Sequence, residues 1–266
     1  MRLPERTYSG YAAFARRIRN EARYVLDADQ RAFLDTVVKT SNSRSLMLPS
    51  QTLLWRARLG FNGYTPMKAG SLLLEMEVPH QLCDMKPLRD RSKEGRVNAK
   101  GMPCLYCSTD RDTAMNELRP WIGAKITVAE LLTLRPLKIV DCTADHLVGL
   151  GALMHLVMGK KEDKLLWSDI NAALSEPVTD SDDTADYVPT QALAEAFRIY
   201  GFDGIKYSGK VGEGASIALF DLEAATVISR HVFDAKSRTL TFEPASPPIY
   251  EAGHPSPQPQ EWVPAD

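Results

Sequence analysis

The sequence lacks any long apolar segment. None of its runs approaches the roughly 18 consecutive apolar residues that a membrane-spanning helix needs. The first residues, MRLPERTYSG, also lack the apolar centre of a signal peptide. We therefore expect a cytoplasmic protein with no membrane partner.

Cysteine and histidine are scarce, with four and five copies in 266 residues. Cys104 and Cys107 form a CxxC pair, but no second CxxC and no histidine pair at ligand spacing accompanies them. Because both lie in a strand-like run, three residues apart, they should point to opposite faces. We expect reduced, buried thiols and no metal site. The scattered histidines also argue against Cys/His and Ser/His catalysis.

The net charge of −2 is small but unevenly distributed. Residues 1–120 hold 20 Lys/Arg against 13 Asp/Glu, and residues 121–266 hold 12 against 21. A predicted amphipathic helix over 8–26 carries much of the positive charge, at Arg16, Arg17, Arg19 and Arg23. No helix-turn-helix or finger pattern accompanies it, so we expect a solvated basic face and no direct nucleic-acid binding.

Apolar periodicity predicts a mixture of helices and strands without a regular βαβ rhythm, which favours an α+β fold. Helices are predicted over 8–26, 28–40, 111–119, 144–158, 167–175 and 190–200. Strands are predicted over 52–59, 72–78, 102–107, 125–129, 137–142, 204–208, 215–221, 225–234 and 238–243.

The chain divides into three predicted parts. Residues 1–50 form a helical segment, ending in a polar linker, that packs on a body spanning 51–243. Within this body, residues 60–95 should be loop-rich. The tail, 244–266, holds seven of the 17 prolines, so we expect it to be disordered.

The stretch from 95 to 117, GRVNAKGMPCLYCSTDRDTAMNE, carries the most chemistry. Arg96 lies in a Gly-Arg-x-Asn turn, Tyr106 near the end of an apolar strand, and Glu117 in a short helix. A cation, an aromatic ring and a carboxylate suit a substrate with phosphates, a planar ring and a sugar carbon that becomes positive. A dinucleotide such as NAD has all three.

These residues occur in a set of segments that resembles the RES-domain family over roughly residues 8–235. The segments are LWRARLG (54–60), EGRVNAKGMPCLYCSTDRDTAMNELRP (94–120), LKIVDCT (137–143), DYVPTQALAEAF (186–197), GFDGIKYSG (201–209) and SIALF (216–220). The resemblance implies an ADP-ribosyltransferase-like mixed-sheet core that takes NAD as its substrate. It also implies a toxin that an Xre-like antitoxin partner holds inactive.

The resemblance places three catalytic residues in the central segment. Glu117 would stabilise an oxocarbenium-like transition state as the nicotinamide–ribose bond breaks. Arg96 would bind the diphosphate through its planar fork, and Tyr106 would stack on nicotinamide or bond the ribose. Each residue could instead be an ordinary surface or packing residue.

Further binding residues are expected on two other strands. Arg56 and Arg58 alternate in LLWRAR, share one face, and need a phosphate or a structural carboxylate as partner. The family pattern has a serine two residues after the tyrosine of Gly-Ile-x-Tyr, where this chain has Gly209 and the serine is Ser208. Either a bulge turns Ser208 inward, or the role is missing. The segment DYVPTQ is expected to be mainly structural.

Three functions remain open from the sequence. The first is hydrolysis or phosphorolysis of NAD, and the second is transfer of ADP-ribose to a protein. The third is a module that binds a dinucleotide without turnover, which the displaced serine favours and Arg96, Tyr106 and Glu117 oppose.

Overall fold

The structure is a computed structural model that describes residues 10–69, 72–89, 92–143, 161–176, 184–209 and 214–237. It falls into two units, Met1–Lys236 and Ser237–Asp266. The predicted helix over 144–158, the predicted strand over 238–243 and the proline-rich tail lie outside the described residues.

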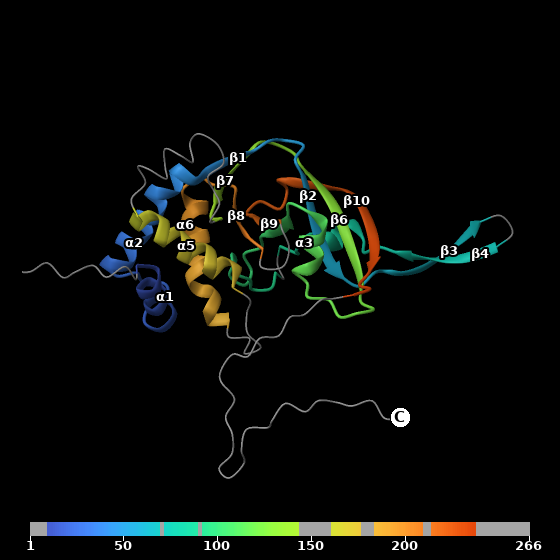
Figure 1. Ribbon diagram of the computed structural model, residues 1–266, viewed down its shortest axis with the longest axis horizontal. Helices are drawn as coiled ribbons and strands as arrows, with labels where there is room; N and C mark the ends of the chain where they lie inside the picture. The colour runs from blue at the N-terminus through green and yellow to red at the C-terminus, as the bar shows by residue number, and fades with distance from the viewer. Residues whose placement is uncertain are drawn as a thin grey trace, which may run out of the picture. The chain divides into compact units, whose positions relative to one another are not determined.

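The first unit combines helices with a large mixed sheet, as the predicted α+β class requires (Figure 1). The α-helices are α1 (Gly10–Asn20), α2 (Ala28–Ser41), α3 (Arg111–Asn116), α5 (Lys161–Ser175) and α6 (Val188–Ile199). Short 3₁₀ helices are η1 (Asn42–Arg44), η2 (Leu82–Met85) and η3 (Thr184–Tyr187). The described helices are all too short or too polar to cross a membrane.

Eight strands form the main sheet in the order β1-β7-β8-β9-β5-β2-β6-β10. Among the strands that the structure describes, β7 and β8 form the one parallel pair, and the other neighbours are antiparallel. The strands are β1 (Ser45–Leu48), β2 (Leu53–Leu59), β5 (Leu105–Ser108), β6 (Lys125–Thr133), β7 (Leu137–Asp141), β8 (Gly204–Ser208), β9 (Ala215–Leu219) and β10 (Ala225–Asp234). A separate hairpin of β3 (Gly63–Ala69) and β4 (Leu72–Val78) extends from the β10 end of this sheet in Figure 1.

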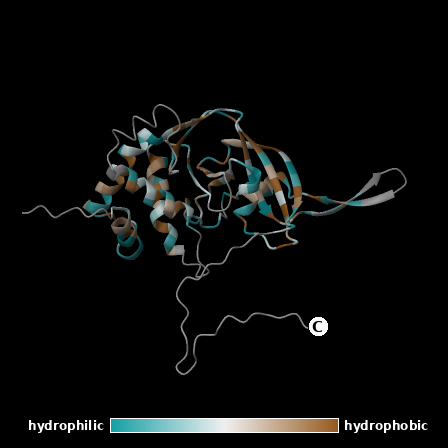
Figure 2. Cartoon of the chain, viewed as in Figure 1, coloured by the Kyte–Doolittle hydropathy of each residue, from teal (hydrophilic) through white to brown (hydrophobic). Residues whose placement is uncertain are grey.

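Alternate strand residues point into two buried clusters, one on each face of the main sheet. Tyr207 and Ala218 belong to the cluster that α1, α2, α5 and α6 cover, and we call this side the helical face. Cys107 and Ile217 belong to the cluster on the opposite face. Figure 2 shows the matching alternation of apolar and polar residues along the helices and strands. The sheet therefore separates two environments, and strand parity decides which one a side chain reaches.

Several predicted elements differ from the structure, and for three of them the reason is local. The helix expected over 8–26 ends at Asn20, because Asp27 starts a new helix through a capping box with Gln30. The expected linker over 41–50 contains β1, whose residues are mostly exposed and so show no apolar alternation. The expected loop after residue 60 contains β3, which pairs with β4. Its Gly63 and Pro66 are residues that usually interrupt strands, so the sequence does not indicate a strand here.

Candidate active site

The first residues of α6 hold the Gly-Arg-x-Asn turn, residues 95–98, in place through hydrogen bonds. Gln191 Nε2 donates to the carbonyl oxygens of Gly95 and Asn98, at 2.9 and 3.0 Å. Thr190 Oγ1 donates to the carbonyl oxygen of Arg96 at 2.6 Å. The DYVPTQ segment therefore has the structural role expected of it, which is to fix the backbone that carries Arg96.

Tyr106 fastens the same turn from the strand side. Its hydroxyl donates to Asn98 Oδ1 at 2.7 Å and accepts from the Val97 amide at 3.0 Å. A Cβ at Gly95 would lie only 2.7 Å from this hydroxyl, so the close approach requires glycine. Burial raises the pKa of Tyr106 well above its ordinary value. The Tyr106 hydroxyl therefore holds the turn that carries Arg96, and contact between Tyr106 and a substrate stays a prediction.

The Arg96 side chain reaches the end of α5. Its Nη1 donates to the carbonyl oxygen of Leu174 at 2.6 Å, in the last turn of the helix, where carbonyls lack an intrahelical partner. Its positive charge also acts on the hydroxyls of Tyr106 and Tyr207. Arg96 thus lies on the helical face beside both tyrosines.

Glu117 follows the last residue of α3 and acts as its C-cap. Asp110 begins this helix by accepting from the Thr113 amide at 2.8 Å, so its expected start is confirmed, but it ends earlier than the predicted residue 119. Thr113 and Ala114 are buried, as their small size anticipated, while Glu117 is exposed. Glu117 Oε1 accepts a hydrogen bond from Ser216 Oγ at 3.2 Å.

The charges of both Arg96 and Glu117 act on the buried hydroxyl of Tyr207 in β8. Tyr207 lies directly opposite Ser216 in the β8–β9 ladder. Burial raises the pKa of Tyr207, the negative charge of Glu117 raises it further, and Arg96 opposes both effects. Arg96 and Glu117 therefore share one neighbour. Neither Tyr207 nor Ser216 was predicted as a site residue, because only the strand register brings them together.

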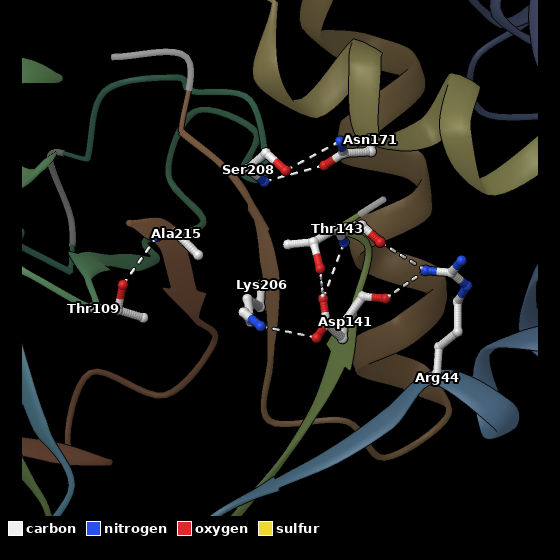
Figure 3. Close-up of polar contacts among 8 residues, drawn as sticks. All are labelled: Arg44, Thr109, Asp141, Thr143, Asn171, Lys206, Ser208 and Ala215. Carbon is white, nitrogen blue, oxygen red and sulfur yellow. Dashed lines mark hydrogen bonds and ion pairs between the residues drawn. The ribbon is translucent and has the colours of Figure 1, made fainter. Parts of the chain in front are cut away.

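The structure places Ser208 away from Glu117. The β8–β9 ladder runs through Ser208↔Ala215 without a bulge. Asn171 of α5 bonds both the Ser208 amide, at 3.1 Å, and its hydroxyl, at 3.2 Å (Figure 3). The inward bulge considered for Ser208 is therefore absent. The next residue, Gly209, approaches the carboxylate instead: a Cβ there would lie 3.3 Å from Glu117 Oε1.

Arg56 and Arg58 share a face, as expected, but it is the opposite face of the sheet. Trp55 pairs with Ser108, which lies on the helical face with Ser216, so its neighbour Arg56 points the other way. Arg56 Nη1 donates to the Tyr106 carbonyl at 2.7 Å, and Arg58 Nη1 donates to the Asp84 carbonyl at 2.6 Å. Arg58 also pairs with the Asp84 carboxylate at 3.8 Å, a structural partner of the kind considered from the sequence. The sheet separates both arginines from Glu117.

Two other expectations concern the cysteines and the basic helix. Cys104 and Cys107 are free and buried, and burial raises their pKa values to about 11 and about 12. In the described ranges no group of His, Cys, Asp or Glu could hold a metal ion.

Arginines of α1 are paired with carboxylates: Arg16–Glu21, Arg17–Asp27, Arg17–Asp29 and Arg19–Asp186. These ion pairs offset much of the positive charge that a nucleic acid would need.

Comparison with known proteins places this geometry in a family. No curated protein matches the chain. A crystal structure of the M. tuberculosis MbcT–MbcA toxin–antitoxin complex is similar at 14% identity, covering 75% of this chain and 92% of that chain, with a TM-score of 0.37. The RES domain model matches residues 75–243, which is more than half of the chain and includes Arg96, Tyr106 and Glu117. The chain belongs to the RES domain family.

Proposed function

We propose that this protein is an enzyme that consumes NAD by cleaving the nicotinamide–ribose bond. The observation that carries the proposal is that Arg96 and Glu117, from separate segments, both approach the end of β8. Arg96 bonds the Leu174 carbonyl, and the next residue of α5, Ser175, donates to the Ser208 carbonyl at 2.7 Å. A Cβ on the following residue, Gly209, would lie 3.3 Å from Glu117 Oε1. A cation and an exposed carboxylate at one point of the sheet suit a substrate with a diphosphate and a developing sugar cation.

Glu117 supplies the chemistry in this proposal. As the bond to nicotinamide breaks, both bonding electrons leave with the neutral base and positive charge develops on the ribose carbon. A carboxylate next to that carbon lowers the energy of the charged state. Water then adds to the carbon and loses a proton, giving ADP-ribose. Phosphate in place of water would give the phosphorylated sugar.

Arg96 supplies binding. Its guanidinium is half-buried and its Nη1 already contacts the Leu174 carbonyl, so the group is oriented before substrate arrives. The rest of the planar fork suits phosphate oxygens. Transfer of ADP-ribose to a protein side chain uses the same cation and is the second candidate.

The test is incubation of purified protein with NAD, followed by separation of products by mass. Free nicotinamide with ADP-ribose indicates hydrolysis, and a phosphate-dependent product indicates phosphorolysis. Mass added to a candidate protein indicates transfer. NAD that binds but stays intact under all three conditions would contradict the proposal and leave a non-catalytic binding module.

We also propose that the protein acts as a toxin controlled by an antitoxin partner of the Xre-like kind. The support is membership of the RES family and the expectation that free NAD-destroying activity injures its own cell. Expression of the chain alone should lower cellular NAD and arrest growth, whereas Glu117→Gln should be tolerated. Harmless expression of active, folded wild-type protein would contradict the toxin role.

A further inference from the structure

Few contacts fix the position of the Glu117 side chain. It is exposed and lies just beyond the end of α3, a position where a long side chain has several rotamers available. Within the described parts of the chain, the hydrogen bond from Ser216 Oγ to its Oε1, at 3.2 Å, is the one that fixes the carboxylate. Ser216 itself is 4% exposed and sits in the middle of the sheet, on β9.

The direction of the bonds follows from the groups involved. A carboxylate only accepts, so the single Ser216 proton goes to Glu117. Tyr207 lies directly opposite Ser216 in the ladder, so the two side chains are neighbours on the helical face. The result is one buried hydroxyl, fixed on a strand, that donates to one oxygen of Glu117.

Gly209 explains why the hydroxyl comes from β9. A Cβ at this position would lie 3.3 Å from Glu117 Oε1 and 3.2 Å from both the Gly214 carbonyl oxygen and Thr113 Cγ2. The backbone oxygen is part of the loop before β9 and cannot move aside as a side chain can. A serine here would therefore crowd the carboxylate that Ser216 already engages.

We propose that Ser216 is a positioning residue for Glu117, and that it supplies from β9 the hydroxyl that position 209 cannot supply here. The inference rests on the proposed NAD cleavage for its kinetic readout but not for its structural one. Because Ser216 engages Oε1, the other oxygen, Oε2, remains available to the sugar.

The kinetic test compares Ser216→Ala with a matched control. Ser229 of β10 donates to Glu130 Oε2 at 2.7 Å, so Ser229→Ala removes the same kind of bond elsewhere on the sheet. Ser216→Ala should lower kcat by about 10-fold, since a bond to a charged group is lost, while KM changes little. Ser229→Ala should leave both constants unchanged.

The structural test does not depend on turnover. In a crystal structure of Ser216→Ala, Glu117 should lose its single carboxylate position, while in Ser229→Ala it should keep it. An unchanged Glu117 position in Ser216→Ala, or an unchanged kcat when the wild type cleaves NAD, would overturn the inference. If Ser216→Ala does not fold, Ser216→Cys, which keeps nearly the same size but is a much weaker donor, provides the same two measurements. A wild type that leaves NAD intact would overturn the proposed function, and the crystal structures would still decide whether Ser216 positions Glu117.

Discussion

Arg96 caps the C-terminal turn of α5 through a 2.6 Å hydrogen bond from its Nη1 to the carbonyl oxygen of Leu174. The same residue is anchored through its own carbonyl by Thr190 of α6. One arginine thus links two helices to the strand-side turn that carries it. Substrate binding and local stability should therefore respond together to changes at this position.

Replacement of Arg96 by Lys should weaken NAD binding by about 1–3 kcal/mol, because lysine keeps the charge but loses the planar fork. Calorimetry in a Glu117→Gln background would measure this without turnover. Arg198→Lys is the matched control, since Arg198 Nη2 similarly donates to the Phe220 carbonyl at 3.0 Å. Equal NAD affinity for the Arg96→Lys and Arg198→Lys variants would show that Arg96 does not contribute to NAD binding.

Glu117→Gln should reduce NAD turnover by roughly 100-fold or more, since the amide cannot offset the developing positive charge. The side chain is exposed, so the melting temperature should stay close to that of wild type. Wild-type turnover in the folded variant would exclude Glu117 as the stabilising group.

Substitutions at positions 208 and 209 should have different effects on NAD turnover. Ser208→Ala should leave turnover near wild type, because its hydroxyl faces Asn171 of α5. Gly209→Ala should lower turnover, because the added Cβ would lie 3.3 Å from Glu117 Oε1 and 3.2 Å from the Gly214 carbonyl oxygen. Steady-state assays of both variants give the comparison. A large loss in Ser208→Ala with none in Gly209→Ala would reverse the assignment.

The sequence predicts this fold best where strand-forming residues are frequent and helices have clear caps. The strands predicted over 204–208 and 225–234 have the observed bounds, and both segments are rich in β-branched and aromatic residues. In contrast, β1 is short and mostly exposed, and β3 contains residues that usually interrupt strands. Neither gives an apolar pattern that distinguishes it from a loop.

The candidate site is harder to predict, because strand register depends on pairing between segments that are far apart in the sequence. Arg56 looks like a phosphate ligand in its own strand, but its pairing with the sheet turns it away from Glu117. Ser216 has no distinguishing sequence pattern, and only the structure places it opposite Tyr207 with its hydroxyl bonded to Glu117. Both placements come from long-range pairing, which periodicity within a segment cannot supply.

The last prediction concerns stability and uses the polar network at the end of β7. Asp141 is buried and accepts from Lys206 Nζ at 2.9 Å and from Thr143 Oγ1 at 2.6 Å, while Arg44 Nη1 donates to the Asp141 carbonyl at 3.0 Å (Figure 3). Burial alone would raise the pKa of Asp141, but the bonds from Thr143 and Lys206 outweigh it and lower the pKa.

A lowered folded-state pKa means that the ionised carboxylate stabilises the fold above its unfolded pKa of about 3.9. This contribution is lost as the pH falls through the lower, folded-state value. Asp141→Asn keeps the size but removes the charge beside Lys206, so it should destabilise the fold by about 1–3 kcal/mol at neutral pH. The difference from wild type should begin to shrink below about pH 4, where Asp141 takes up a proton in the unfolded wild type. It should continue to shrink as the pH falls through the lower folded-state pKa, below which both folded proteins are neutral at position 141. Urea unfolding from pH 3 to pH 7 measures the difference. A gap between the two proteins that stays constant across this range would show that the Asp141 charge does not stabilise the fold.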